Sequence, residues 1–174
     1  MTILLGFLLG ACNTQIGSTI SAAGDTTTSV QKNPLTYVYT ATYSSDVTAP
    51  SHPENAQKVL IVWKMFEQNK IDSMKPYWAD TITYNDAGGM HFRGPTESLL
   101  NVAKKDIEGL DSLRFDLVSW QSEHVNDRNE DWVRIWARER RYSKNKQPDT
   151  SQIQENWRIK NGRIDYFDQY KAHW

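Results

Sequence analysis

The sequence has a single cysteine, Cys12, and only four histidines, which are dispersed at positions 52, 91, 124 and 173. One cysteine excludes an intramolecular disulfide, and the histidines lack the spacing of a metal site. Positive charge is not in excess, because 20 Lys and Arg face 21 Asp and Glu. This balance argues against nucleic-acid binding. Nucleophile-elbow, zinc-protease, phosphate-loop and dinucleotide motifs are also missing, so we expect no metal, no cofactor and no nucleic-acid partner.

The apolar run at residues 3–9, Ile-Leu-Leu-Gly-Phe-Leu-Leu, is too short to cross a bilayer core of about 30 Å as a helix. Its length is typical of the hydrophobic region of a secretory signal. The following Leu9-Gly10-Ala11-Cys12 resembles the bacterial lipobox, in which the cysteine becomes the lipidated first residue of the mature protein. The resemblance implies a signal peptide and lipobox at residues 1–12, a lipid anchor on Cys12 and a place in the bacterial cell envelope.

Residues 13–33 consist mainly of Thr, Ser, Gly, Gln and Asn, with almost no large apolar side chain. Such a segment cannot offset its ordering entropy by burial, so we expect a flexible tether. Residues 34–174 show no second boundary and no internal repeat. A chain of that length buries about two thirds of its unfolded surface. The sequence therefore predicts one domain at residues 34–174 behind a tether.

The domain begins with two segments of different periodicity. Residues 35–43 alternate large apolar side chains with smaller or polar ones, which is typical of a strand or of an extended arm against the domain. The sequence Ser51-His52-Pro53-Glu54 has the form of a capping box, and an apolar stripe at helical spacing follows it. We therefore expect a helix at residues 52–69.

A turn, a hairpin and a second helix come next. The pattern predicts a short turn at residues 72–78, a strand at 80–86 and a returning strand at 90–93. Gly94-Pro95-Thr96-Glu97 then predicts the start of a helix that ends near Gly109, because proline suits the first helical position and Glu the positive end of the helix dipole.

A long alternating segment at residues 113–125 predicts a strand with apolar residues on both faces. By parity Leu113, Phe115 and Leu117 share one face, and Val118 and Trp120 share the other. We therefore expect both faces of this strand to be covered.

The last third of the chain reads as three successive strands at residues 131–142, 152–160 and 163–171. Asn161-Gly162 is the dipeptide typical of a tight two-residue hairpin. We therefore expect an antiparallel meander. Its first strand has an Arg and Trp face, which is suited to the convex side or a homodimer interface, and an opposite, mostly aliphatic face. The aliphatic face would point Glu139, and Glu155 on the next strand, toward the interior, although parity alone leaves open which face is inside.

Three motifs carry a resemblance to a known family: Tyr77-Trp78-Ala79-Asp80 before the first strand, Phe92-Arg93-Gly94-Pro95-Thr96-Glu97 at the second helix, and the segment at residues 157–164 around the last turn. The chain resembles the NTF2-like superfamily and its SnoaL-like group. This implies an α+β cone, in which a curved antiparallel sheet carries the N-terminal and middle helices on its concave face. The family includes isomerases, dehydratases, cyclases and non-catalytic binding modules, so the fold does not decide the chemistry.

In that family the pocket lies inside the cone, and a catalytic member needs an acid and a base there. Tyr84 and His124 are possible participants, and Asp86 and His91 could meet across the hairpin at Gly88-Gly89. If the protein is an enzyme, the candidate acids and bases are Asp86, His91, Glu139 and Glu155. The expected pocket residues are Trp63, Trp78, Tyr84, Glu139, Glu155 and Trp157.

These features lead to two functional hypotheses. The first is a lipid-anchored envelope protein whose domain binds a small apolar molecule or a protein partner without catalysis. The second is an isomerase or cyclase type of enzyme that uses an acid and base pair in the pocket. Coordinates discriminate between them, because convergence of two candidate groups in a closed pocket favours the enzyme, whereas a cone filled by side chains removes both small-molecule hypotheses.

Overall fold

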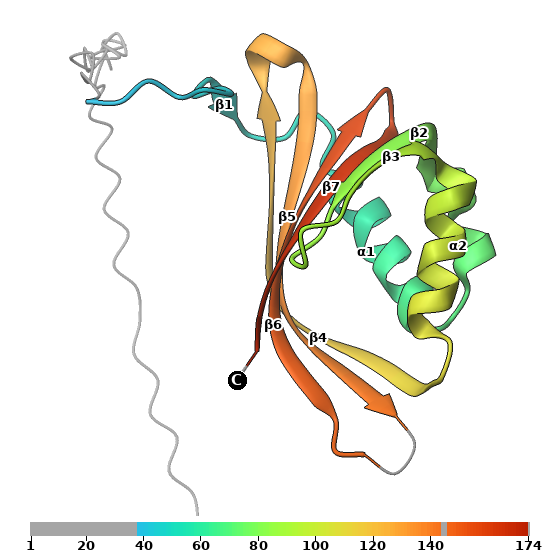
Figure 1. Cartoon of the computed structure of the whole chain (residues 1–174). Coiled ribbons are helices and arrows are strands. Elements are labelled where there is room, and N and C mark those ends of the chain that lie inside the picture. Colours follow the sequence, from blue (N-terminus) through green and yellow to red (C-terminus); the bar gives the residue numbers. More distant parts are fainter. Residues whose placement is uncertain (1–37, 144–145, 174) are drawn as a thin grey trace, which may run out of the picture. The chain divides into compact units, whose positions relative to one another are not determined.

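The computed structural model describes residues 38–143 and 146–173. The chain divides into a first unit that ends at Tyr39 and a second unit that starts at Thr40, and the helices and strands of the described residues lie in the second. That second unit is a mixed α and β domain built on one seven-stranded sheet, with strand order β1-β4-β5-β6-β7-β2-β3 (Figure 1). The predicted α+β architecture is confirmed.

The three strands of the predicted antiparallel meander form, and the strand before them joins as a fourth. They are β4 (Leu110–Val125), β5 (Glu130–Ser143), β6 (Asp149–Lys160) and β7 (Arg163–His173). Asn161 and Gly162 have φ values of 52° and 75°, the left-handed conformation that the tight β6–β7 turn requires.

The other strands complete the sheet at its two edges. The hairpin of β2 (Trp78–Asn85) and β3 (His91–Pro95) adds to β7, and β1 (Val47–Thr48) pairs with β4. β2 runs parallel to β7, so the sheet is antiparallel except at this one pairing of described strands. The two strands are far apart in sequence, and the intervening helices and strands allow the parallel direction.

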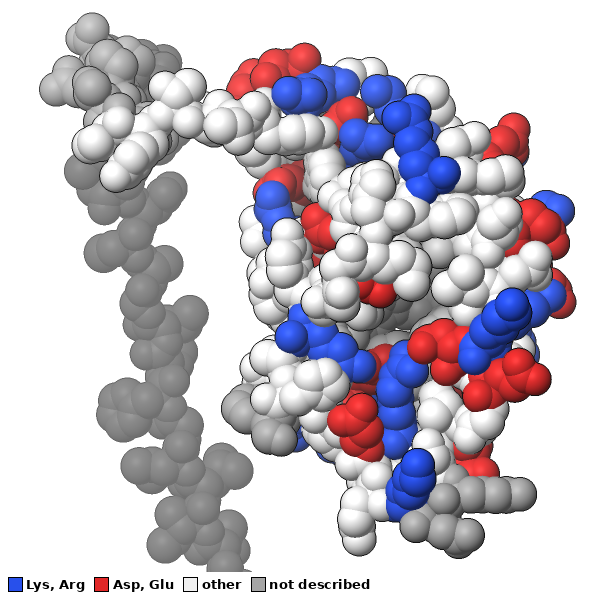
Figure 2. Space-filling view, viewed as in Figure 1, with Lys and Arg blue, Asp and Glu red and all other residues white. Residues whose placement is uncertain are grey.

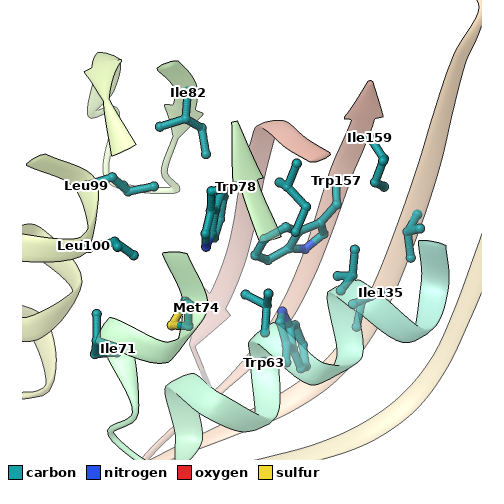
Figure 3. Packing of buried hydrophobic residues seen from close by; sticks show 14 of the residues in the cluster. Trp63, Ile71, Met74, Trp78, Ile82, Leu99, Leu100, Ile135, Trp157 and Ile159 are labelled. Atoms are coloured by element: carbon teal, nitrogen blue, oxygen red, sulfur yellow. The ribbon is translucent and has the colours of Figure 1, made fainter. Parts of the chain in front are cut away.

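The helices α1 (Glu54–Glu67) and α2 (Thr96–Ile107) and the 3-10 helix η1 (Ile71–Tyr77) pack against the concave side of the sheet (Figure 1). A second, short 3-10 helix, η2 (Asn126–Arg128), connects β4 to β5. None of the helices within residues 38–143 and 146–173 is long and apolar enough to cross a membrane. The core lies between the helices and the sheet (Figure 3), and it includes Val59, Ile82, Leu100, Ile135 and Ile164.

The predicted capping box at the start of α1 is wrong. Pro53 already has helical angles, with φ −60° and ψ −23°, and α1 begins at Glu54 without a side-chain cap. The His52 carbonyl accepts the first turn's hydrogen bond from the Asn55 amide at 3.0 Å, which leaves Ser51 outside the helix. The Glu54 carboxylate instead lies 3.1 Å from His52 Nδ1.

The predicted strand at residues 35–43 is not formed at residues 38–43, and residues 35–37 lie outside the described part of the chain. Val38 and Tyr39 are 92% and 89% exposed, and the contacts with the domain begin at Tyr43, the last residue of the predicted segment. The Tyr43 hydroxyl donates to Glu130, its carbonyl accepts from Arg128 at 3.0 Å, and its ring meets Trp132 edge-on. The strand of this region is β1, four residues further on, because its backbone reaches the edge of β4 there.

The expectation that both faces of β4 are covered is also wrong. The pairing of β4 with β5 shifts between Leu117 and Ser119, and this bulge places Trp120 opposite the inward-facing Ile135. Val118 is 74% exposed and Trp120 53% exposed. Parity fails here because a bulge inserts one residue and reverses the faces of everything that follows it.

Candidate functional site

A cavity of about 310 Å³ lies between the helices and the concave side of the sheet. The walls are mainly apolar and aromatic side chains from α1, η1, α2 and the strands β2 and β4 to β7. On the surface, acidic and basic side chains border a hollow between the sheet and the helices (Figure 2). The cone is therefore not filled by its own tryptophans and phenylalanines.

Stacked rings form one wall of the cavity. Phe167 stacks on Trp157 at 4.6 Å between ring centroids and on Tyr84 at 4.2 Å. This stack follows from the strand register, because Phe167 of β7 is directly opposite Trp157 on one side and Tyr84 on the other. Trp78 extends the wall, with its ring centroid 5.5 Å from that of Trp157. Trp63 and Phe115 also line the cavity and pack on each other, with ring centroids 4.6 Å apart.

Glu155 on β6 is the buried polar centre of the cavity. Its Oε2 accepts hydrogen bonds from the indole Nε1 of Trp63 at 2.6 Å and of Trp157 at 2.9 Å, and its Oε1 accepts from Gln169 Nε2 at 2.7 Å. Figure 3 shows Trp63 of α1 and Trp157 of β6 with their indole nitrogens turned toward a common region. One carboxylate thus joins α1, β6 and β7 under the helices.

The environment of Glu155 opposes its ionisation. Burial raises the pKa of Glu155 to about 7, although the hydrogen bonds from Gln169, Trp63 and Trp157 favour the charged form. The carboxyl group therefore changes its protonation near neutral pH. Groups with such pKa values inside apolar cavities are typical of functional sites.

Glu139, the second inward carboxylate, belongs to a separate charge cluster. It accepts hydrogen bonds from Lys171 Nζ at 2.5 Å, from Arg141 Nε at 3.1 Å and from Ser151 Oγ at 3.3 Å. Arg141 also binds both carboxylate oxygens of Asp106 on α2, at 3.0 and 2.5 Å. Two acids and two bases thus neutralise one another at this end of the cavity.

The two inward carboxylates do not converge. Ile135 is the β5 partner of Glu155, and Glu139 lies four residues beyond Ile135 on the same strand. At about 3.3 Å per residue, the two backbone positions are about 13 Å apart.

Two further polar groups line the cavity. Burial raises the pKa of Tyr84 above its usual value, which keeps its hydroxyl protonated as a hydrogen-bond donor. Trp78 is 2% exposed, and its indole Nε1 has no hydrogen-bond partner within the described residues. This nitrogen is itself buried, so its lost hydration is not compensated within the described residues.

The structure places all six expected pocket residues in the cavity wall: Trp63, Trp78, Tyr84, Glu139, Glu155 and Trp157. Asp86 lies at the rim, where its Oδ1 accepts a hydrogen bond from the Met90 amide in the β2–β3 turn. His91 Nδ1 instead lies 2.5 Å from Asn85 Oδ1, and Asp86 bonds to the Met90 amide, so the two are not paired across the hairpin.

His124 lies outside the cavity wall. Its Nδ1 is 2.7 Å from Asp131 Oδ1, and Asp131 in turn accepts from Asn55 Nδ2 at 2.8 Å. This network fastens the start of α1 to the sheet. Among the described residues, no cluster of three or more His, Cys, Asp or Glu side chains is arranged to hold a metal ion.

Sequence reasoning missed several cavity residues, which are Asp106, Phe115, Arg141, Phe167, Gln169 and Lys171. Strand parity is enough to place Phe115 and Arg141 on the inner face, because Phe115 shares a face with the buried Leu113 and Arg141 shares one with the buried Ala137. Parity does not place the β7 residues, because the β6–β7 pairing shifts between Arg158 and Ile159. Counting back from the turn pairs Glu155 with Asp168, whereas the bulge brings Gln169 opposite it.

No family model and no curated protein matches this sequence. The fold, in contrast, has many solved relatives. An M. tuberculosis LEH-like epoxide hydrolase superposes with a TM-score of 0.57 and 11% identity, over 68% of this chain and 83% of that one. An NTF2-like protein of unknown function from Burkholderia pseudomallei gives a TM-score of 0.54 and 16% identity, over 68% and 91%.

A third solved structure is a hypothetical protein with a ketosteroid isomerase-like fold from Catenulispora acidiphila, in complex with trimethylamine. It gives a TM-score of 0.54 and 15% identity, over 71% of this chain and 86% of that one. Identities this low show the fold alone. The predicted NTF2-like fold is confirmed, and its relatives include both an enzyme and proteins of unknown function.

Proposed function

We propose that this chain binds a small, mostly apolar molecule in the cavity beneath α1 and α2, and that it does so without catalysis. The observation that carries the proposal is the open cavity of about 310 Å³ behind a wall of stacked aromatic rings. Ligand pockets measure about 300–1,000 Å³ and combine apolar walls with a few fixed polar groups. Glu155 is that polar group here.

The absence of catalysis rests on the distribution of the candidate acids and bases. Glu155 has no second titratable group in hydrogen-bond contact among the described residues, because its three partners are two indoles and an amide. Glu139 is neutralised by Lys171 and Arg141. General acid and base catalysis needs groups within about 3 Å of the transferred proton or one water away from it.

A second candidate function is an isomerase or cyclase type of reaction in which Glu155 alone takes and returns the proton. The observation in its favour is the pKa of Glu155, which burial raises to about 7. That value suits an acid and base at neutral pH, and the fold supports an epoxide hydrolase elsewhere.

Titration with the neutral fluorophore N-phenyl-1-naphthylamine tests the binding proposal. Ala103 lines the cavity, so A103F fills it and is expected to lower the affinity at least tenfold. V118F adds a ring at an exposed position of β4 and serves as the control. Equal affinity of wild type, A103F and V118F would place the probe elsewhere and contradict the proposal.

We further propose that the domain is held at the bacterial cell envelope by a lipid on Cys12, where the ligand or a protein partner reaches it. The support is the lipobox-like sequence Leu9-Gly10-Ala11-Cys12 after a short apolar run. In a bacterial host, C12A is expected to move the protein from the detergent-soluble membrane fraction to the soluble fraction. An unchanged membrane fraction would rule out this anchor.

A further inference from the structure

The charged side chains of the cavity wall do not balance. Two are basic and four are acidic, so the wall carries a net charge of −2 when all are ionised (2 − 4 = −2). The basic residues are Arg141 and Lys171, and the acidic residues are Asp86, Asp106, Glu139 and Glu155.

Both basic side chains already form ion pairs with acidic side chains other than Glu155. Lys171 lies 2.5 Å from Glu139, and Arg141 lies 2.5 Å from Asp106 and 3.1 Å from Glu139. Asp86 is at the rim, where it holds the β2–β3 turn. Glu155 is therefore the one deeply buried carboxylate of the described cavity wall that has no cationic partner.

A buried carboxylate without a countercharge is costly, because neutral N–H donors replace only part of its lost hydration. A cationic ligand removes this cost when it lies beside the carboxylate. Glu155 can still interact with a ligand cation, because its Oε1 accepts a single hydrogen bond, from Gln169, and a carboxylate oxygen can accept two. Aromatic faces also attract cations, and Trp63, Trp157 and Phe167 line the same cavity as Glu155.

Building on the proposed function, we propose that the ligand is a small organic cation, an amine with apolar substituents, whose positive nitrogen lies beside Glu155 among the aromatic rings. A ligand without charge would leave the carboxylate uncompensated. An anionic ligand would meet a wall whose two cations are already paired. The cavity thus selects positive charge inside an apolar envelope.

This ligand class gives binding a defined pH dependence. Cation binding requires the ionised form of Glu155, whose pKa burial raises to about 7. The charged or titratable groups that share the cavity are Tyr84, Asp86, Asp106, Glu139, Arg141 and Lys171. With a pKa near 7, the ionised fraction rises about 30-fold between pH 5.5 and pH 8. The affinity for a permanent cation is expected to rise by the same factor.

Two isosteric probes test the charge directly. Benzyltrimethylammonium is a permanent cation, and neopentylbenzene has the same shape with carbon in place of nitrogen. Each is titrated against the full chain at pH 5.5 and pH 8 by displacement of N-phenyl-1-naphthylamine. At pH 8 the cation is expected to bind wild type at least tenfold more tightly than the neutral isostere does.

The variant E155Q is expected to lose that preference and the pH dependence, so that it binds the cation and the neutral isostere with similar affinity at both pH values. E97Q makes the same substitution at an exposed position outside the cavity and is expected to behave like wild type. Persistence of the cation preference in E155Q would overturn the assignment to Glu155.

The outcomes separate this inference from the proposed function. If the naphthyl probe binds the cavity and the neutral isostere displaces it as well as or better than the cation at pH 8, the cation inference fails and the proposed function stands. If A103F leaves the binding of the naphthyl probe unchanged, the proposed function itself is contradicted, whatever the result with the cation.

Discussion

The three tryptophans around the cavity have similar burial but different hydrogen bonding. Trp63, Trp78 and Trp157 are 6%, 2% and 4% exposed. Trp63 and Trp157 both donate to Glu155, whereas the Nε1 of Trp78 is unpaired within the described residues. A buried donor bonded to a charged acceptor stabilises the fold, and an unpaired one carries the cost of its lost hydration.

The first prediction uses this contrast. W63F, W78F and W157F delete the same atoms at similarly buried positions, so the cost of lost packing is comparable. W63F and W157F are expected to lower the free energy of unfolding by about 1–3 kcal/mol more than W78F does, because only they remove a hydrogen bond to a carboxylate. Urea unfolding at pH 8 measures the difference. Equal losses in all three variants would mean that the bonds to Glu155 contribute nothing net.

The second prediction concerns the pH dependence of stability. Burial raises the pKa of Glu155 from its ordinary value of 4.5 to about 7, so between these values the folded state binds the proton more tightly than the unfolded state. Stability from this group is therefore present below pH 4.5 and is lost as the pH rises to 7. Shifts of this size correspond to about 3 kcal/mol.

The variant E155Q isolates this effect. Its amide oxygen can still accept from both indoles, but it does not titrate. Relative to wild type, its free energy of unfolding is expected to rise by about 3 kcal/mol between pH 4.5 and pH 8 in urea titrations. Parallel pH profiles of the two proteins would contradict the raised pKa.

Parity along β5 and β6 grouped Glu139 and Glu155 with aliphatic and aromatic residues on one face of each strand, but it left open which face is inside. The structure buries that face, and both carboxylates are interior. Gln169 was not predictable, because the bulge that brings it opposite Glu155 is set by three-dimensional packing of β7 between β6 and β2. The raised pKa of Glu155 was likewise beyond the sequence, because burial causes it.

At the scale of elements, the cluster around Glu139 connects parts of the chain that are not neighbours in the sheet. Glu139 lies on β5 and Lys171 on β7, with β6 between them. Arg141 extends the cluster to Asp106 at the end of α2. The cluster therefore closes one end of the cavity and holds α2 against the sheet.

The third prediction is a coupling energy across β6. Glu139 is 3% and Lys171 16% exposed at the side chain, so removal of either partner leaves a poorly hydrated charge. A double-mutant cycle of E139Q and K171M is expected to give a coupling of about 1–3 kcal/mol in urea unfolding. The exposed pair Lys64 and Glu67 on α1 is the control, with an expected coupling below about 0.5 kcal/mol. Equal couplings would mean that burial adds nothing to the inner pair.

Among the elements themselves, those with strong local signals were predicted and those decided by long-range contacts were not. The two α-helices, the β2–β3 hairpin and the last turn all carry periodic or turn residues in the sequence. The parallel pairing of β2 with β7 and the bulge in β4 have no local signal. Parity placed Trp120 on the outer face of β4. The bulge puts it on the inner face instead, where it is half exposed.

At the scale of the whole molecule, the fold provides the cavity but not its ligand. One protein of similar fold is an epoxide hydrolase, and another was solved in complex with trimethylamine. A shared fold therefore does not decide the chemistry, which depends on the polar groups of the cavity wall, here Glu155. A homodimer through the convex Arg and Trp face stays a prediction, and sedimentation of the purified chain tests it.

The last prediction concerns the independence of the domain from the first 33 residues. The buried apolar residues of the described core all lie between Ala56 and Ile164, well beyond the predicted tether in the sequence. A variant that lacks residues 1–33 is therefore expected to unfold with a free energy within about 0.5 kcal/mol of full-length C12A and with the same dependence on urea. Tryptophan fluorescence reports on both equally, because all seven tryptophans lie beyond residue 33.

The same pair of variants separates anchoring from binding. The truncated chain and C12A are both expected to bind N-phenyl-1-naphthylamine as wild type does, because the cavity wall within the described residues runs from Val62 to Lys171. Both are also expected to leave the membrane fraction. A loss of more than about 1 kcal/mol, or a smaller urea dependence, on truncation would show that the first 33 residues bury surface against the domain, because that slope scales with the area exposed on unfolding.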